Sequence, residues 1–516
     1  MVCEARASAN PFVFLAGENE KSVKNKCRLC LNNMDLNKLT IKEAHKLLEG
    51  KEITSVELVK AHFNEIKKRD KDIHAFLFLN EEEALAAAKK VDERISRGEP
   101  IEMLAGIPAA IKDNILIRGT KVTAASKILE NYIAPYDATV IKKLKEEEAI
   151  FIGKTNMDEF AMGSSTENSA FGPTRNPVDL ERVPGGSSGG SAAAVKAGFS
   201  VYALGSDTGG SIRQPAGFCG VVGFKPTYGA VSRHGLIAMA SSLDQIGPIA
   251  RNVDDAAAVF EIIRGVDELD STSVDLDWQD YWDSPLDIEE IKIGVPREYF
   301  IHGLNPKIEK NIKSVISKLE KEGAKIEEIS LPYSEWALAT YYIIMPAEVS
   351  ANLARFDGIR YGYSTINKEE RLQNLFDVYL KSRGKGFGAE VRRRIMLGTY
   401  ILSAGYYDAY YTRAQKVRRL IKQDFDRAFK EVDVIITPTS PTTAFKFGEK
   451  TQDPLSMYLA DVYTVSVNLA GVPGISIPVA NEQGLPVGLQ LIGKNFDDVK
   501  LLKIAKIVEQ LIKEMT

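Results

Sequence analysis

Cysteine and histidine are scarce in this sequence of 516 residues. The four cysteines are too few for a disulfide scaffold, and such scarcity is typical of proteins from a reducing cytoplasm. Of the five histidines, only His234 and His302 follow the serine-rich segment described below. A serine nucleophile with a histidine base therefore has few candidates, and His234, which precedes Gly235, has a setting typical of a structural turn.

Long hydrophobic runs and an excess of charge are also absent. No stretch of about 18 uninterrupted apolar residues occurs, which argues against a transmembrane helix. Lysine and arginine total 66 against 70 aspartates and glutamates, for a formal charge of −4. This balance indicates neither nucleic acid nor a membrane surface as a partner, and we expect a cytoplasmic protein.

The first 33 residues differ from those that follow. The run PFVFLAG is too short for the apolar part of a signal peptide, and the acidic residues around it do not fit a transit peptide. Cys27-x-x-Cys30 could supply half of a zinc site, but no second pair follows. We therefore expect residues 1–33 to be a disordered or artefactual extension, and we expect no metal site.

Helical patterns come next. Thr40-x-x-Glu43 and Thr54-x-x-Glu57 have the spacing of capping boxes, in which side chains bind the free N–H groups at a helix start. Apolar residues at helical spacing follow, and a third helix is predicted between Asn80 and Ile95. These segments predict a helical N-terminal layer packed against the core.

Short apolar strands then alternate with helices over about residues 101–265, which is an α/β pattern. Residues 297–430 are mainly helical, and strand-like runs return over 431–516. Because the strands at both ends of the chain suit one core, we predict a single α/β/α domain over residues 34–516 rather than separate modules.

The segment Val183–Gln214 is the most unusual part of the sequence. Its glycine and hydroxyl residues form two clusters, 185–191 and 207–211, separated by an alanine-rich helical run and an apolar strand-like run. Glycines let backbone N–H groups converge without interference from side chains. The two clusters could therefore form a pocket for an anion or an oxyanion.

Three interpretations of this segment compete. A flexible linker does not carry apolar runs such as VYAL between its glycines. A phosphate loop needs G-x-x-x-x-G-K-[ST], and the nearest match, EAIFIGKT at residues 148–155, has glutamate in place of the first glycine. The third interpretation is a serine nucleophile, since G-x-S-x-G occurs twice, around Ser187 and Ser188.

Lysine is an alternative to histidine as the base for such a serine. Lys112 interrupts the apolar run LAGIPAAIKDNILI at residues 104–117. A lysine in such a run is rarely buried without a reason, and burial would lower its pKa enough for it to act as a base. A lysine at a strand edge, with its ammonium group in water, is the other interpretation.

Three longer motifs resemble a known family. They are GIPAAIKDN around Lys112, GGSSGGSAAAV from Gly185, and GSDTGGSIRQPAGFCGVVGFKPTYG from Gly205. This pattern resembles the amidase signature family, and the resemblance extends from about Met34 to the C-terminus. It implies a large mixed sheet covered by helices on both faces.

The resemblance also implies catalytic residues. The family uses a serine–cis-serine–lysine triad, and matching the motifs places the lysine at Lys112, the bridging serine at Ser187 and the nucleophile at Ser211. The peptide bond before Ser187 is then expected to be cis. The implied oxyanion hole consists of the backbone N–H groups of Thr208, Gly209, Gly210 and Ser211.

Further segments are similar to a branch of the family that hydrolyses glutamine within a tRNA-dependent amidotransferase. The similar segments are 156–177, 232–248, 390–411 and 457–479. Glutamine carries an α-carboxylate and an α-ammonium group, so its site needs a cation and an anion. The resemblance assigns these roles to Arg394, with Arg393 as the nearest alternative, and to Asp461. Tyr342 and Ser164 are implied as further pocket residues.

The implied reaction is hydrolysis of glutamine through an ester on Ser211, with release of ammonia. In that branch the ammonia passes to a B subunit, where ATP and Mg activate Glu-tRNA(Gln) for conversion to Gln-tRNA(Gln), and a small C subunit completes a heterotrimer. We expect no cofactor on this chain and tRNA contacts mainly through the B subunit. The alternatives are a stand-alone amidase of small, peptide or fatty-acid amides and a catalytically inactive scaffold subunit.

Overall fold

A computed structural model of the chain describes residues 34–283, 285–300, 303–366, 372–451 and 453–515. The predicted extension at residues 1–33, with Cys27 and Cys30, lies outside them. In the described part, eleven strands form one sheet in the order β1-β3-β2-β4-β6-β5-β10-β11-β9-β7-β8. The strands are β1 (Phe76–Leu79), β2 (Pro108–Lys112), β3 (Ile150–Thr155), β4 (Tyr202–Asp207), β5 (Val222–Lys225), β6 (Gln245–Ala250), β7 (Lys292–Pro296), β8 (Lys325–Ile329), β9 (Val434–Pro438), β10 (Gly474–Glu482) and β11 (Leu485–Gly493).

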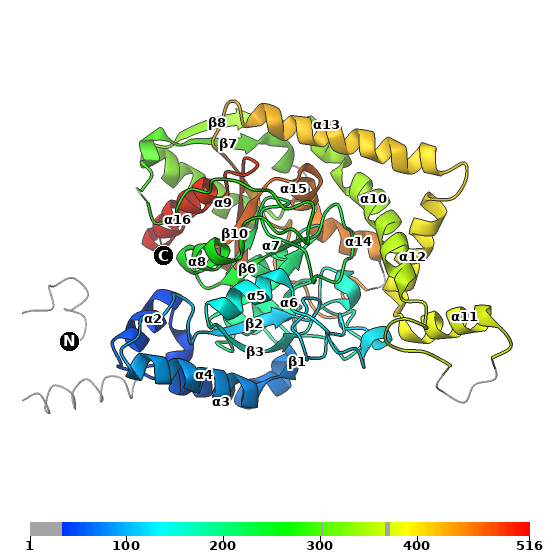
Figure 1. The fold of residues 1–516 in the computed structure, drawn as a ribbon. Helices are drawn as coiled ribbons and strands as arrows, with labels where there is room; N and C mark the ends of the chain where they lie inside the picture. Colours follow the sequence, from blue (N-terminus) through cyan, green and yellow to red (C-terminus); the bar gives the residue numbers. More distant parts are fainter. Residues whose placement is uncertain (1–33, 284, 301–302, 367–371, 452, 516) are drawn as a thin grey trace, which may run out of the picture.

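Helices surround this sheet (Figure 1). The first half of the chain contributes α2 (Ile41–Glu49), α3 (Ser55–Ile73), α4 (Glu81–Ser96), α5 (Thr139–Glu146), α6 (Gly189–Lys196), α7 (Arg213–Cys219) and α8 (Val253–Ile263). The second half contributes α9 (Pro306–Lys321), α10 (Ala337–Asn352), α11 (Leu375–Gly386), α12 (Ala389–Ile401), α13 (Arg413–Ala428), α14 (Pro454–Tyr458), α15 (Val465–Ala470) and α16 (Asp498–Met515). None of the described helices is long and apolar enough to span a bilayer.

The sheet is mixed and joins both ends of the chain. Strand β2 runs parallel to β3 and β4, whereas β5 pairs antiparallel with β10, so that Lys225 lies opposite Gly474. Strand β9 in turn joins β11 to β7. The prediction of one interwound α/β unit with a mixed sheet is therefore confirmed.

Neighbouring residues of β5 show that helices lie on opposite faces. Successive strand residues point to opposite sides of a sheet. A Cβ atom on Gly223 would lie 2.6 Å from the Ala216 side chain of α7. The ring of Phe224, one residue later, packs edge-on against Phe260 of α8 with ring centres 5.1 Å apart. Helix α7 thus covers the face on which the two glycine clusters meet, and α8 covers the other.

The N-terminal layer contains the predicted helices and one strand. Thr40 with Glu43 and Thr54 with Glu57 form both predicted capping boxes, at the starts of α2 and α3. Between α3 and α4, however, the chain forms the edge strand β1, which pairs antiparallel with β3. The layer is therefore not purely helical, and β1 attaches it to the sheet by backbone hydrogen bonds.

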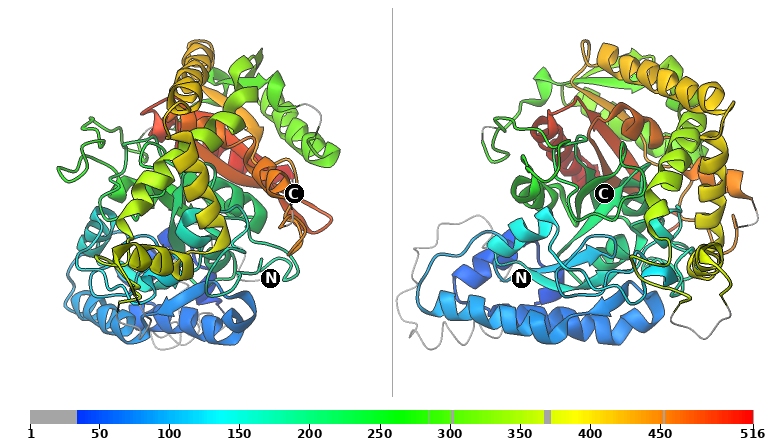
Figure 2. Two further views of the ribbon diagram at one scale, coloured as in Figure 1. Left: turned by 90° about the vertical axis from the view of Figure 1, so that its right-hand side faces the viewer. Right: turned by 45° about the vertical axis from the view of Figure 1, so that its right-hand side comes forward.

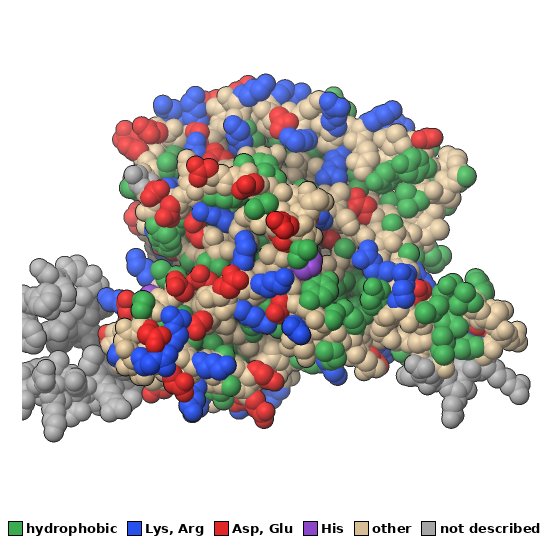
Figure 3. All heavy atoms as spheres, in the orientation of Figure 1, with side chains coloured by type: hydrophobic (Ala, Val, Ile, Leu, Met, Phe, Trp, Pro, Cys, Tyr) green, Lys and Arg blue, Asp and Glu red, His purple; other side chains and the backbone are tan. Residues whose placement is uncertain are grey.

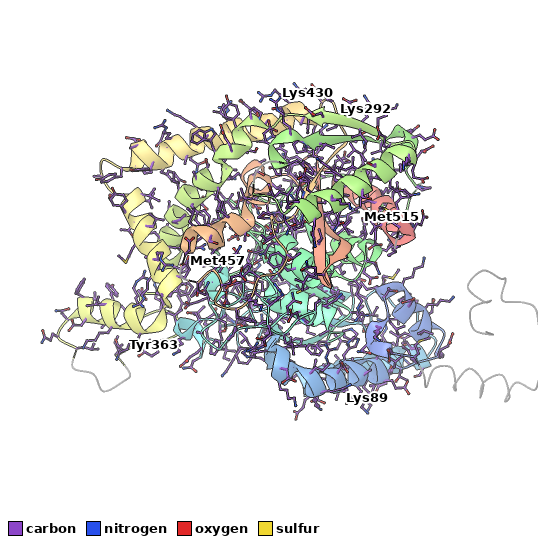
Figure 4. All side chains as sticks on the ribbon, turned by 180° about the vertical axis from the view of Figure 1, so that it is seen from behind. Lys89, Lys292, Tyr363, Lys430, Met457 and Met515 are labelled. Carbon is purple, nitrogen blue, oxygen red and sulfur yellow. The ribbon has the colours of Figure 1, made fainter. Side chains whose placement is uncertain are left out.

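Long helices of the second half frame the other end of the sheet. Figure 2 shows α10, α12 and α13 along one side of the molecule. Ile308, Ile312 and Val315 of α9 are buried at helical spacing, as their pattern predicts. Seen from behind in Figure 4, Lys292 of β7 and Lys430, just after α13, lie at the same outer edge.

Candidate active site

Lys112 ends strand β2, which lies between β3 and β4, and is completely buried. Its Nζ lies 2.8 Å from Ser187 Oγ, 2.8 Å from Ser188 Oγ and 2.9 Å from Ser206 Oγ. Burial lowers the pKa of Lys112 to about 7, although nearby carboxylates oppose the shift. Near neutral pH a substantial fraction of this amine is therefore unprotonated and able to accept a proton from a neighbouring hydroxyl.

The Gly186–Ser187 peptide bond is cis, as the resemblance implies. The backbone N–H of Gly186 donates to Gln214 Oε1 at 3.0 Å. A Cβ atom on Gly186 would lie 2.1 Å from Asp158 Oδ2, so only glycine fits against this carboxylate. Ser187 is thereby held beside Lys112 from the loop that precedes α6.

Ser211 lies in the second glycine cluster, and a backbone hydrogen bond joins the two clusters. The N–H of Ser188 donates to the carbonyl oxygen of Ser211 at 3.1 Å. Ser211 retains 8% of its surface, whereas Lys112 and Ser187 are completely buried. Of these three residues, Ser211 is thus the one that a substrate from solvent can reach.

Asp207 organises the loop before Ser211. Its carboxylate accepts the N–H of Gly210 at 2.8 Å and the N–H of Ile212 at 3.0 Å. The single N–H of Gly210, which was also predicted to be an oxyanion donor, is thus directed at the Asp207 carboxylate in this structure, and its role in the oxyanion hole stays a prediction. The predictions for Thr208, Gly209 and Ser211 are unaffected by this contact.

The buried Asp207 is paired with Arg213, at the start of α7. Nη2 of Arg213 lies 3.0 Å from Asp207 Oδ1, and neither side chain is exposed. Burial alone would raise the pKa of Asp207, but the guanidinium group holds it well below its usual range. Arg213 also donates to Gln490 Oε1 at 2.6 Å and to Asn468 Oδ1. Sequence reasoning missed this pair, although two opposite charges flank the glycine cluster.

Arg394 lies on the buried side of α12 and is only 4% exposed. Its Nε donates to Glu390 Oε1 at 2.8 Å, and its guanidinium carbon lies 5.5 Å and 5.6 Å from the ring centres of Tyr342 and Tyr458. Arg393 instead has a half-exposed side chain that pairs with Glu390. Between the two predicted arginines, Arg394 is therefore the one that points inward.

Asp461 lies in a short turn after α14 and is 7% exposed. Ser164 Oγ donates to its Oδ2 at 2.5 Å. Burial raises the pKa of Asp461 to about 7, although Ser164 and Arg394 pull it down. The four predicted pocket residues thus form one polar group, in which Arg394 contacts Tyr342, Ser164 binds Asp461, and Arg394 is near enough to lower the pKa of Asp461.

Hydrogen bonds connect this polar group to the serine loops. Gln214, which binds Gly186, donates its Nε2 to the Ser164 carbonyl at 2.9 Å. Thr464 Oγ1 donates to the Gly209 carbonyl at 2.6 Å and lies 3.0 Å from that of Asp461. The predicted pocket residues and the serines therefore belong to one site.

The remaining candidate bases and ligands lie elsewhere. His234 stacks on Tyr136, with ring centres 5.1 Å apart, and lies 3.2 Å from Thr139 Oγ1. His302 is outside the described residues. Among the residues that the structure describes, no group of three or more histidines, cysteines and carboxylates is placed to hold a metal ion.

Comparison with known proteins agrees with this arrangement. The model of the Amidase family matches residues 57–502. The chain is 59% identical to the A subunit of glutamyl-tRNA(Gln) amidotransferase from Carboxydothermus hydrogenoformans, over 92% of this chain and 98% of that protein. It is 57% identical to the A subunit of the same enzyme from Geobacillus thermodenitrificans, over 91% of this chain and 96% of that protein.

Solved structures give the same result. The crystal structure of the A subunit of glutamyl-tRNA(Gln) amidotransferase from Thermotoga maritima is 46% identical, with a TM-score of 0.76, and the match covers 93% of this chain and 96% of that one. A chain from a vestigial protein complex related to an s-triazine catabolic enzyme is 29% identical, with a TM-score of 0.80, over 92% and 98% of the two chains.

Proposed function

Because the chain belongs to the amidase family, we propose that it is the glutamine-hydrolysing A subunit of a glutamyl-tRNA(Gln) amidotransferase. The observation that carries this proposal is that buried Arg394 and buried Asp461 both lie beside the serine loops, near enough to each other for Arg394 to lower the pKa of Asp461. These two charges are complementary to the α-carboxylate and α-ammonium groups of glutamine. An amidase for uncharged amides has no need of either charge.

In the proposed mechanism, unprotonated Lys112 takes the proton of Ser187 while Ser187 takes that of Ser211. The Ser211 oxygen attacks the side-chain amide carbon of glutamine. Backbone N–H groups of Thr208, Gly209 and Ser211 stabilise the oxyanion, and each such donor typically contributes about 3–4 kcal/mol to lowering the barrier. The proton returns to the leaving nitrogen, so that ammonia departs and a glutamyl ester remains on Ser211. Water then hydrolyses the ester by the same proton route.

Substrate orientation is assigned to the polar group. The planar guanidinium of Arg394 suits two parallel hydrogen bonds to the α-carboxylate. Asp461, held by Ser164, faces the α-ammonium group, and Tyr342 flanks the aliphatic part of the substrate. Contacts to two charged ends fix the amide carbon relative to Ser211, which accelerates a reaction between bound groups.

The ammonia would be used on a partner subunit. We propose the B and C subunits as partners in a heterotrimer in the cytoplasm, with ATP, Mg and most tRNA contacts on the B subunit. Exposed apolar side chains support a partner contact on this chain. Phe376 and Leu380 of α11 and Met396 of α12 are 67%, 60% and 71% exposed, and Figure 3 shows hydrophobic side chains gathered over α11.

The test is glutamate formation from glutamine by the chain with and without co-purified B and C subunits. Ser211→Ala should reduce it by at least about a thousandfold. Asp461→Asn should raise KM for glutamine at least about tenfold, because the α-ammonium loses its charged partner. Glutamine turnover that survives Ser211→Ala would exclude the triad, and full activity of the isolated chain on simple amides, with little on glutamine, would favour a stand-alone amidase.

A further inference from the structure

Glu159 is a buried carboxylate that the mechanism does not use. It follows Asp158 directly in the chain, and its side chain is only 2% exposed. The backbone N–H of Gly388 donates to both of its oxygens, at 2.9 Å to Oε2 and 3.2 Å to Oε1. Ser126 Oγ donates to Oε1 as well.

These contacts fall at the start of α12, the helix that carries Arg394. Gly388 is the residue before the first turn of α12, and no side chain of its own segment caps this helix end. Glu159 accepts the N–H of Gly388 as the glutamate of a capping box does, but from a position 229 residues away in sequence. Burial raises the pKa of Glu159 to about 7, and in its ionised form it places a negative charge at the positive end of the helix dipole.

The fit between Glu159 and α12 is close. A Cβ atom on Gly388 would lie 2.2 Å from Glu159 Oε2, so any larger residue at this position would have to shift the contact with the Glu159 carboxylate. Gly386, at the end of α11, is pressed in the same way against Ile128, whose Cδ1 would lie 2.4 Å from an added Cβ. The junction between α11 and α12 is therefore fitted against residues of the N-terminal half.

Asp158 connects the same segment to the catalytic loop. Its carboxylate accepts the N–H of Thr166 at 2.9 Å. The same carboxylate packs directly against Gly186, since a Cβ atom on Gly186 would lie 2.1 Å from Asp158 Oδ2. Its own N–H donates to the Ser187 carbonyl at 3.4 Å. Two consecutive carboxylates thus hold the serine loop on one side and the Arg394 helix on the other.

We propose that Glu159 is a positioning residue that fixes Arg394 at the distance from the serines which the length of glutamine requires. The proposal rests on the assigned role of Arg394 in binding the α-carboxylate. It predicts a specific defect, in which the enzyme loses its advantage for substrates with that carboxylate. A general loosening of the fold would instead affect all amides.

The experiment compares two substrates in the chain co-purified with its amidotransferase partners. One is glutamine and the other is 4-aminobutyramide, which is glutamine without the α-carboxylate. The measured quantity is the ratio of kcat/KM for the two amides, from ammonia release. Glu159→Ala should lower this ratio at least about tenfold, mainly through KM for glutamine. Glu159→Gln, which keeps one acceptor oxygen for Gly388, should stay within about threefold of wild type.

Asp255 provides a matched control. This carboxylate is also 2% exposed and binds a helix start from a distant segment, since the N–H of Ile41 donates to its Oδ1 at 3.0 Å. Asp255→Ala removes a comparable cap on α2, away from the site, and should leave the substrate ratio unchanged. Thermal unfolding of all variants identifies any that do not fold.

Gly388→Ala supplies an independent route to the same defect. The added methyl group must separate the start of α12 from the Glu159 carboxylate, whichever of the two moves, and should lower the ratio in the same direction. In the double variant, which combines Glu159→Ala with Gly388→Ala, the alanine at position 159 is too short to clash with the added methyl group. The two losses should therefore not add. Equal losses on both amides in Glu159→Ala would overturn the positioning role. An unchanged ratio in Arg394→Ala would instead refute the assignment of Arg394, and with it the proposed glutamine site.

Discussion

Replacing Lys112 by methionine tests whether this lysine is buried with a strongly lowered pKa. The folded protein holds the pKa of Lys112 at about 7, against an ordinary value of 10.5. One pKa unit corresponds to about 1.4 kcal/mol. Keeping the protonated amine buried therefore costs the wild type about 5 kcal/mol at pH values below 7. Methionine avoids this cost but removes the amine that donates to the hydroxyls of Ser187, Ser188 and Ser206.

The pH dependence separates these two effects. Between pH 7 and 10.5 the unfolded chain binds the lysine proton more tightly than the folded protein does. Raising the pH in this window therefore stabilises the wild type relative to Lys112→Met. The difference between the two free energies of unfolding should change by about 1.4 kcal/mol per pH unit in this window and become constant below it.

Urea unfolding of both proteins at several pH values measures this difference. All other titrating groups are common to the two chains, so their contributions cancel in the comparison. Amidase activity of the wild type should rise with pH through the same pKa, because the unprotonated amine is the base. A stability difference that does not vary with pH over the window would refute the lowered pKa and the base assigned to the mechanism.

Two substitutions test the loop before Ser211. Arg213→Met leaves Asp207 buried without its cation and should lower the free energy of unfolding by about 3–5 kcal/mol. Calorimetry or urea unfolding measures this loss, and an unchanged unfolding midpoint would contradict the buried ion pair. Gly209→Ala places a Cβ atom 2.7 Å from the Tyr341 ring and should lower kcat for glutamine at least about tenfold, since it shifts an oxyanion donor. Gly384→Ala, with no atom within 4 Å of the added Cβ, should leave kcat unchanged and serves as its control.

Local patterns in the sequence predicted local structure well. The capping boxes at Thr40 and Thr54 formed because each depends on residues three positions apart. The glycine clusters are loops only in part, since Gly189 begins α6 and the last three residues of the first cluster are helical. Strand β1 was missed because its four residues are too few to show a strand period, and it is stabilised by pairing with β3 across the chain.

The site itself required information that no short segment contains. Lys112 and Ser187 are 75 positions apart in the sequence. Only the family resemblance predicted that they belong to the same site. The roles of Asp158, Glu159 and Asp207 were not predicted, because their carboxylates bind backbone N–H groups, which any residue can supply. Which of Arg393 and Arg394 points into the protein depends on which face of α12 is buried. Arg394 lies on the buried face with Val391 and Gly398.

The partners of Arg213 also bear on how the protein is made. The loop that carries Ser211 is held by Arg213, and Arg213 is held by Asn468 and Gln490, near the end of the chain. Strand β5 likewise lacks its neighbour until β10 has been synthesised. Domains of a nascent chain fold as units when their segments have left the ribosome. The hydrolytic loop therefore reaches its final form only after almost the whole chain has been translated, so a prematurely terminated product carries the serines but not the site.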